Sequence, residues 1–211
     1  MKKKILFSLF SLLASLILPC MATAKGEKTS VKSIVCFTDD FAGKKTYQSP
    51  DLKACRFEGF FLLQLGVNLI PRFVIENDVC SITLEIDYHI GTVDDEVFEK
   101  IIFMGNGKKA VVDIDTSKMT YSKVHLKNVE GHGHKCFGTI SKEEYDVLKS
   151  VFENCGDAKF SAYSSMNKTL QGDVKGKKHM TLFSDLETAT LADNPDVSFA
   201  KGDGIIEISA Q

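Results

Sequence analysis

The stretch FEKIIFMGNGKKAVVDIDT, residues 98 to 116, decides the fold because it places Asn106-Gly107 between two apolar runs. Both residues of this pair tolerate a positive φ, which a tight two-residue β-hairpin requires. We therefore predict that residues 99 to 105 pair antiparallel with residues 108 to 114.

The residues before this hairpin also favour strands. Residues 31 to 37 are rich in β-branched and aromatic residues, and a second short extended piece follows a turn. Residues 57 to 75 are apolar on both faces for much of their length, which predicts a central strand broken near Gly66 and Pro71. Residues 81 to 91 alternate apolar and polar side chains, and this period of two predicts a strand with one buried face.

A helix is predicted after one or two further extended segments in residues 120 to 140. Ser141 followed by Glu144 is the pattern of a capping box, in which hydroxyl and carboxylate accept from free backbone donors. Gly156 can end this helix. Its expected buried side chains are Tyr145, Leu148 and Phe152.

The end of the chain returns to mixed structure. We predict a strand over 158 to 164, a second helix over 180 to 194 and a final strand over 204 to 209. Strands in hairpin order with late helices favour an α+β fold, a mainly antiparallel sheet with one or two helices packed on a face. The alternative is a β-sandwich with short helices.

The first 24 residues have the layout of a secretory signal peptide. Lys2 to Lys4 precede an uncharged run of 14 residues and the A-x-A site Ala22-Thr23-Ala24, so the mature chain should begin at Lys25. The run is shorter than the roughly 20 residues that span a bilayer, and no later stretch approaches that length. Lipidation at Cys20 is the alternative, but Pro19 is not the small residue that such signals need. We expect one α+β domain, residues 25 to 211, exported to the periplasm or the extracellular space.

The charge of the mature chain disfavours some partners. Removing residues 1 to 24 removes three of the 26 basic residues and none of the 28 acidic ones, which leaves 23 against 28, a net charge of −5. A nucleic-acid binder needs a basic face to hold phosphates, so we expect no nucleic-acid partner.

The mature chain contains an odd number of cysteines. In an oxidising compartment, two intramolecular disulfides with one thiol left over are expected, and the unpaired cysteine could form an intermolecular bond. The absence of a C-x-x-C motif disfavours a thioredoxin-like oxidoreductase. The candidates for the disulfides are Cys36, Cys55, Cys80, Cys136 and Cys155.

The stretch VEGHGHKCFGTI, residues 129 to 140, contains the one obvious cluster of metal ligands. On a strand, His132, His134 and Cys136 share a face and offer zinc or copper two imidazoles and a sulfur. His125 could add a fourth ligand if a hairpin turns near residues 128 to 130. The competing interpretation, which we favour, is a glycine-rich loop or bulge with exposed histidines and a disulfide-bonded Cys136, so that no cofactor is bound.

A short acidic motif resembles one found in small exported bacterial proteins of unassigned function. Its pattern is D-D-F-x-G-x-x-x-Y, and the resemblance includes a late strand-helix-strand unit at residues 141 to 160. This resemblance implies no activity. The matching motif residues are Asp39, Asp40, Phe41, Gly43 and Tyr47.

The sequence contains no phosphate-binding loop, nucleophile elbow or zinc-protease helix. Asp51, Glu85 and Asp87 could form a catalytic pair only through contacts that the sequence does not reveal. We therefore expect a non-enzymatic binding or envelope-assembly protein whose partner is an unknown protein or small ligand. The alternative is a periplasmic zinc- or copper-binding protein.

Overall fold

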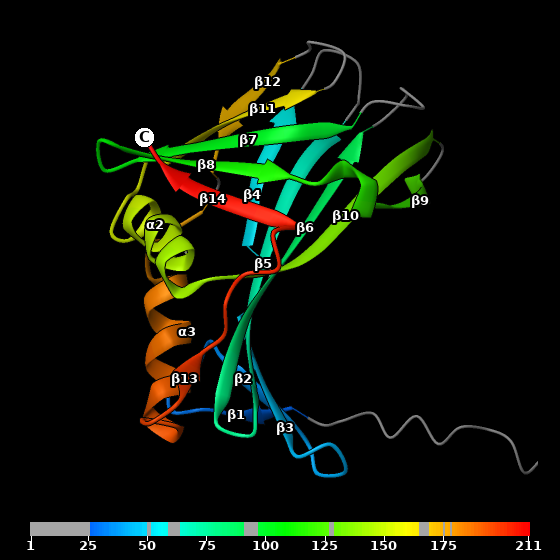
Figure 1. Cartoon of the computed structure of the whole chain (residues 1–211). Helices are drawn as coiled ribbons and strands as arrows, with labels where there is room; N and C mark the ends of the chain where they lie inside the picture. Colours follow the sequence, from blue (N-terminus) through cyan, green and yellow to red (C-terminus); the bar gives the residue numbers. More distant parts are fainter. Residues whose placement is uncertain are drawn as a thin grey trace, which may run out of the picture.

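The computed structural model describes residues 26–49, 52–58, 64–90, 97–126, 129–164, 169–174, 176–177 and 179–211. Within these ranges, nothing is described of the side chains of residues 52–58, 64–66, 88–90, 122–126, 129–132 and 170. The predicted signal peptide lies outside the described residues. The described chain forms mostly antiparallel sheet with two α-helices (Figure 1).

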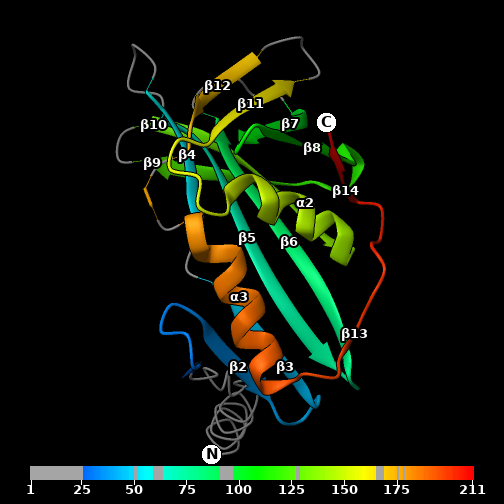
Figure 2. The ribbon, with the colours of Figure 1, turned by 90° about the vertical axis from the view of Figure 1, so that its left-hand side faces the viewer.

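The larger sheet, sheet A, has the strand order β1-β2-β3-β5-β6-β10-β9, with β4 paired to β5 and β13 paired to β6. Two long strands, β5 and β6, form its centre and extend along most of the molecule (Figure 2). The strands of sheet A are β1 Glu27–Lys28, β2 Val35–Asp39, β3 Lys44–Gln48, β4 Leu52–Glu58, β5 Gln64–Glu76, β6 Val79–Ile90, β9 Thr120–Leu126, β10 Val129–Ile140 and β13 Ser198–Phe199.

The smaller sheet, sheet B, has the order β12-β11-β7-β8-β14. All of its strand pairs are antiparallel. It lies across the upper part of sheet A in the view of Figure 1. Its strands are β7 Phe98–Gly105, β8 Lys108–Ile114, β11 Lys159–Ser164, β12 Thr169–Asp173 and β14 Ile206–Ala210, and the short 3-10 helix η1, Thr116–Lys118, follows β8.

The two helices cover one side of the sheets (Figures 1 and 2). Helix α2, Lys142–Phe152, contacts β7, β8 and β14 of sheet B, and helix α3, His179–Asp193, contacts β3, β4 and β5 of sheet A. The helices also contact each other, and the rings of Phe152 and Phe183 stack at 5.4 Å between them. One apolar cluster joins buried side chains of both sheets and both helices.

The structure confirms the predicted hairpin. Within strands 98–105 and 108–114, residues 100–105 pair with residues 108–113, and Asn106 and Gly107 have φ values of 54° and 69°. The turn has a second role that the sequence did not reveal. The Asn106 side-chain amide donates to the backbone oxygen of Glu153 at 2.7 Å, so it also caps the C-terminus of α2.

The capping box is also confirmed. Ser141 Oγ accepts from Glu144 N, and the Glu144 carboxylate accepts from Ser141 N at 2.7 Å. Glu144 makes one further bond, because its Oε1 accepts from Ile208 N of β14 at 3.0 Å. The helix does not end at Gly156. It ends earlier, and Asn154, with a φ of 56°, adopts the left-handed conformation at its C-terminus.

The predicted breaks near Gly66 and Pro71 are wrong, because β5 runs from Gln64 to Glu76 without interruption. Strand β4 pairs with the first part of β5 and β3 pairs with the last part, so the two strands lie end to end along one edge of β5. Pro71 lies between the two paired stretches. Its missing N–H therefore removes no bond on that side, and the proline is tolerated inside the strand.

The second predicted helix is confirmed, with bounds shifted by one residue at each end. Its four expected core residues, Leu182, Phe183, Leu186 and Ala189, are all buried. The first predicted strand starts later than expected, because residues 31 to 34 form a turn and β2 begins at Val35.

Candidate functional site

The predicted metal ligands lie on a β-hairpin. Residues 129–140 form one continuous strand, so the predicted glycine-rich loop or bulge is wrong. Strands β9 and β10 pair as the expected hairpin, with Leu126 opposite Val129. The register places position 125 opposite position 130, which makes it a diagonal neighbour of position 132. The side chains of His125 and His132 lie outside the described part of the structure.

The two described members of this cluster are buried. His134 is 6% exposed and packs edge to face against Tyr121, with ring centroids 5.4 Å apart, so the prediction of an exposed imidazole is wrong at this position. Burial raises the pKa of the Cys136 thiol to about 11, and the carboxylates of Asp115 and Asp203 contribute in the same direction. A metal-bound cysteine is a thiolate, so this environment disfavours Cys136 as a ligand.

Among the described residues, no group of three His, Cys, Asp or Glu side chains is arranged to hold a metal ion. Because two of the four proposed ligands lie outside that set, the zinc or copper site stays a prediction.

The described cysteine side chains are free thiols. Cys80, Cys136 and Cys155 are buried and Cys36 is half-buried. By strand register, Cys36 and Cys80 are three strands apart, or about 14 Å, and Cys80 and Cys136 are six residues apart along β6, or about 20 Å. A disulfide spans at most about 7 Å between Cα atoms, which disfavours both pairs. With the Cys55 side chain outside the described set, the expected disulfides stay a prediction.

The unexpected feature of sheet A is the side opposite the helices, which we call the open face. Register places alternate residues of β2, β3, β5, β6 and β10 on it. On β6 the alternation buries Ile82, Leu84 and Ile86 against the core, as predicted. The polar residues on the opposite side of the strand, Thr83 and Glu85, are nevertheless only 7% and 8% exposed.

An ion-pair network lies at the centre of the open face. The Glu85 carboxylate accepts from Arg72 Nη2 at 2.8 Å and from Lys135 Nζ at 2.5 Å. Arg72 Nε donates to Gln48 Oε1 at 2.8 Å. The network therefore joins β3, β5, β6 and β10, and it holds the two cationic side chains in place.

The protonation of Glu85 reflects a competition. Burial raises the pKa of its carboxyl, but the hydrogen bonds and charges of Lys135 and Arg72 outweigh burial and hold the pKa below its usual range. The same hydrogen bond with Glu85 raises the pKa of Lys135. All three groups are therefore charged near neutral pH.

Apolar side chains surround this network. Phe137 lies opposite Glu85 in the register and is 51% exposed. The others are half-buried and do not belong to the core cluster, so folding leaves part of their apolar surface in water. They are Val35, Phe37, Ile70 and Val74.

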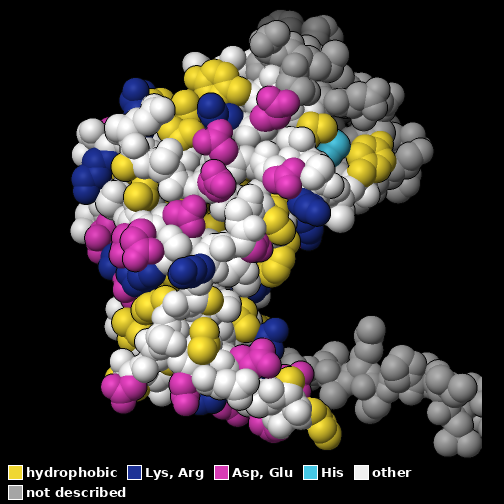
Figure 3. All heavy atoms as spheres, viewed as in Figure 1, with side chains coloured by type: hydrophobic (Ala, Val, Ile, Leu, Met, Phe, Trp, Pro, Cys, Tyr) yellow, Lys and Arg dark blue, Asp and Glu magenta, His cyan; other side chains and the backbone are white. Residues whose placement is uncertain are grey.

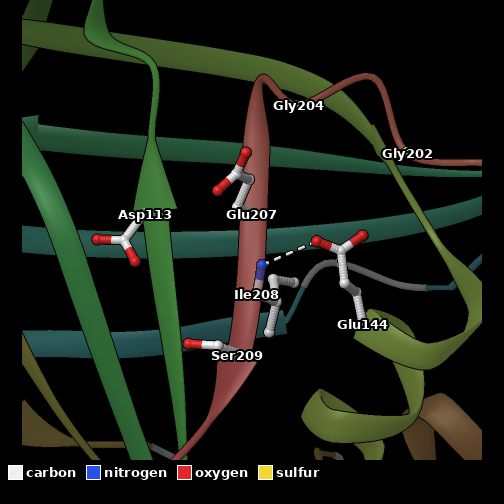
Figure 4. A pocket seen from close by; sticks show the side chains of 7 residues that line it. All are labelled: Asp113, Glu144, Gly202, Gly204, Glu207, Ile208 and Ser209. Atoms are coloured by element: carbon white, nitrogen blue, oxygen red, sulfur yellow. Dashed lines mark hydrogen bonds between the residues drawn. The ribbon is translucent and has the colours of Figure 1, made fainter.

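A separate hollow, of about 380 Å³, lies beside β14 and is acidic. Asp113, Glu144 and Glu207 line it, and Figure 4 shows that their carboxylates point in different directions. Glu144 already accepts from two backbone N–H groups. Asp113 forms an ion pair with Lys100 at 3.4 Å. The lining thus provides neither a converging ligand set nor a nucleophile beside a base.

Sequence reasoning missed Arg72, Gln48, Lys135 and Phe137. One signal was present, because Arg72 is a charged residue within the apolar run from Leu69 to Ile75, and such a residue needs a partner. Its partner, Glu85, was recognised only as an acid without an assigned contact.

No helix in the described part of the chain is long and apolar enough to cross a membrane. No protein-family model, curated protein or solved structure matches the sequence or the fold.

Proposed function

We propose that this is an exported, non-enzymatic protein that binds a partner protein through the open face of sheet A. The observation that carries the proposal is the combination of a pre-ordered ion-pair network and apolar side chains that the core does not cover. Burying apolar surface against a partner stabilises the complex by about 25 cal/mol of free energy per Å². Side chains already fixed by ion pairs lose less entropy when a partner docks.

The dimensions of the open face favour a protein over a small ligand. It spans five neighbouring strands, or about 19 Å at about 4.8 Å per strand. Small-molecule sites are enclosed pockets that surround most of the ligand, whereas a protein partner can lie on a broad sheet face. Figure 3 shows the outline of the molecule hollowed on the side away from the helices.

Site-specific photo-crosslinking in the exporting cells tests this function. A photoreactive phenylalanine analogue at Phe137 should give one discrete adduct with a second protein, because this ring is half exposed on the open face. The matched control is Tyr163 of sheet B, which is 38% exposed and lies away from that face. Arg72→Ala should weaken the adduct at position 137. An equal adduct at both positions, or none at position 137, would reject the proposal.

Export rests on the signal peptide. The intact mass of the exported protein should begin at Lys25, and a diacylglyceryl-modified Cys20 would contradict free export.

The zinc- or copper-binding function is the second candidate, supported by the register of β9 and β10, which brings position 125 near position 132. Metal analysis of the purified mature protein with a free-thiol count tests it. We expect no stoichiometric metal, and bound metal that is lost in His125→Ala/His132→Ala would make this function the leading one.

We also assign the fold to the α+β class over a β-sandwich. The support is that α2 and α3 contribute large side chains such as Tyr145 and Phe183 to the shared core, and do not merely decorate its edge.

A further inference from the structure

One end of sheet A carries two adjacent hairpin turns, and we call it the hairpin end. Strands β2 and β3 turn at residues 40 to 43, and β5 and β6 turn at Asn77-Asp78. The two turns lie side by side because Lys44 pairs with Glu76 in the register. Figure 1 shows both turns at the lower end of the molecule, away from sheet B.

Phe41 projects from this end. Its side chain is fully exposed, at 105% of the reference area, so it contributes no packing to the fold. Val79, in the neighbouring hairpin, is 40% exposed. A fully solvated phenylalanine is unusual, and a large aromatic ring is the kind of side chain that dominates protein interfaces.

The backbone turn that carries Phe41 is closed by hydrogen bonds to Asp39. Asp39 Oδ1 accepts from the backbone N–H groups of Phe41 and Ala42, each at 3.1 Å, and Gly43 provides the positive φ of 62° that closes the turn. The ring is therefore presented from a turn with its own hydrogen bonds.

The hairpin is also tied to the body of the molecule. Tyr47 is buried, donates from its hydroxyl to Asp193 Oδ2 at 3.0 Å and accepts from Asn194 Nδ2 at 3.0 Å. These bonds join β3 to the C-terminal end of α3. Asp39, Gly43 and Tyr47 of the D-D-F-x-G-x-x-x-Y motif thus have structural roles, while the Phe41 side chain has no packing role.

Acidic side chains predominate in the two turns and at the adjoining end of α3. Lys44 and Lys45 are the only described cations among the residues of these two turns and of the adjoining end of α3. Figure 3 shows Asp and Glu side chains gathered at the lower end of the molecule. The exposed acids are Asp39, Asp40, Glu76, Asp78, Asp193 and Asp196.

We propose that the hairpin end docks on a partner protein by inserting Phe41 into an apolar pocket that is rimmed by lysine or arginine side chains. The acidic surround is complementary to such a rim and steers the encounter. It repels anionic lipid headgroups and nucleic-acid phosphates, and a projecting turn cannot enclose a small molecule. This proposal deepens the proposed function, since it rests on the protein being a binding protein and specifies the chemistry of the partner.

A photoreactive phenylalanine analogue at position 41 tests the docking in the exporting cells, because it keeps an aromatic ring there. We expect one adduct with a second protein, cross-linked at an apolar segment flanked by lysine or arginine. Asp40→Lys/Asp78→Lys should abolish that adduct, whereas Lys45→Ala should leave it. High salt should weaken the adduct as well, because exposed charges are screened.

Phe41→Ala then tests the anchor with the purified partner. The Kd of the Phe41→Ala variant for the partner should be roughly thirtyfold or more above that of the wild type, as for an interface hot spot. The urea unfolding midpoint should stay unchanged, because the ring packs against nothing.

Four results would overturn the docking proposal. The first three concern the cross-link: position 41 gives no adduct, the adduct is unaffected by charge reversal, or the adduct consists of two copies of this chain. The fourth is Phe41-dependent sedimentation of the protein with phosphatidylglycerol vesicles. An adduct at Phe137 without one at Phe41 rejects the hairpin-end proposal alone, whereas the absence of both rejects the proposed function too.

Discussion

Replacement of Glu144 by alanine should destabilise the protein more than replacement of its capping partner Ser141. In an isolated capping box the hydroxyl is the more important half. Here the Glu144 carboxylate also accepts from Ile208 N at the edge of sheet B, so it joins the start of α2 to the last strand. Its removal leaves two backbone donors without their acceptor, and Ile208 is only 7% exposed.

The magnitude follows from these two bonds. A hydrogen bond to a charged group contributes about 1.5 to 3 kcal/mol, and because Glu144 is half-buried we take the lower value for each bond. Glu144→Ala should therefore cost about 3 kcal/mol, against about 1 kcal/mol for Ser141→Ala. For a chain of this size, 3 kcal/mol corresponds to a fall in Tm of roughly 6 to 12 °C.

Urea unfolding followed by circular dichroism measures the difference. Glu207→Ala is the matched control, because it removes an exposed carboxylate from the residue next to Ile208 and should leave the midpoint nearly unchanged. Glu144→Gln should be intermediate, since one amide oxygen replaces two carboxylate oxygens. If Glu144→Ala costs no more than Ser141→Ala, the bond to Ile208 contributes nothing and the reasoning is refuted.

Three further predictions follow from the other contacts. Asn106→Asp should destabilise the fold by about 1 to 2 kcal/mol, because it replaces the donor that caps α2 with a negative charge at the negative end of the helix dipole. A urea unfolding midpoint equal to that of the wild type would show that Asn106 does not cap α2. Glu85→Gln should cost about 2 kcal/mol of stability at pH 7. Because the folded-state pKa of Glu85 is depressed, its stabilising contribution is present above the unfolded pKa of about 4.3 and is lost as the pH falls through the folded value. The unfolding free energies of the wild type and the variant, plotted against pH, should therefore converge in acid. His134→Ala should destabilise the protein by about 1 to 3 kcal/mol through lost burial and ring packing. An unfolding midpoint equal to that of the wild type would place the imidazole in solvent.

The sequence determined the features that depend on a few neighbouring residues. Asn106-Gly107 formed the expected turn because only residues that accept a positive φ close a two-residue hairpin with the right twist. Ser141 and Glu144 started α2, since both halves of a capping box lie within one turn. The buried positions of β6 and α3 followed from periods of two and 3.6 residues.

Only the tertiary structure decided which strands became neighbours and what each polar residue contacts. Pro71 was tolerated because β3 and β4 meet end to end beside it. Arg72 of β5 forms an ion pair with Glu85 of β6, and Glu85 in turn forms an ion pair with Lys135 of β10. His134 was buried because it lies on the same face of β10 as the buried Cys136 and packs against Tyr121 of the neighbouring strand, which no residue of the GHGHKC stretch announces. The pairing of distant strands sums many weak contacts over the whole chain, and no local pattern encodes that sum.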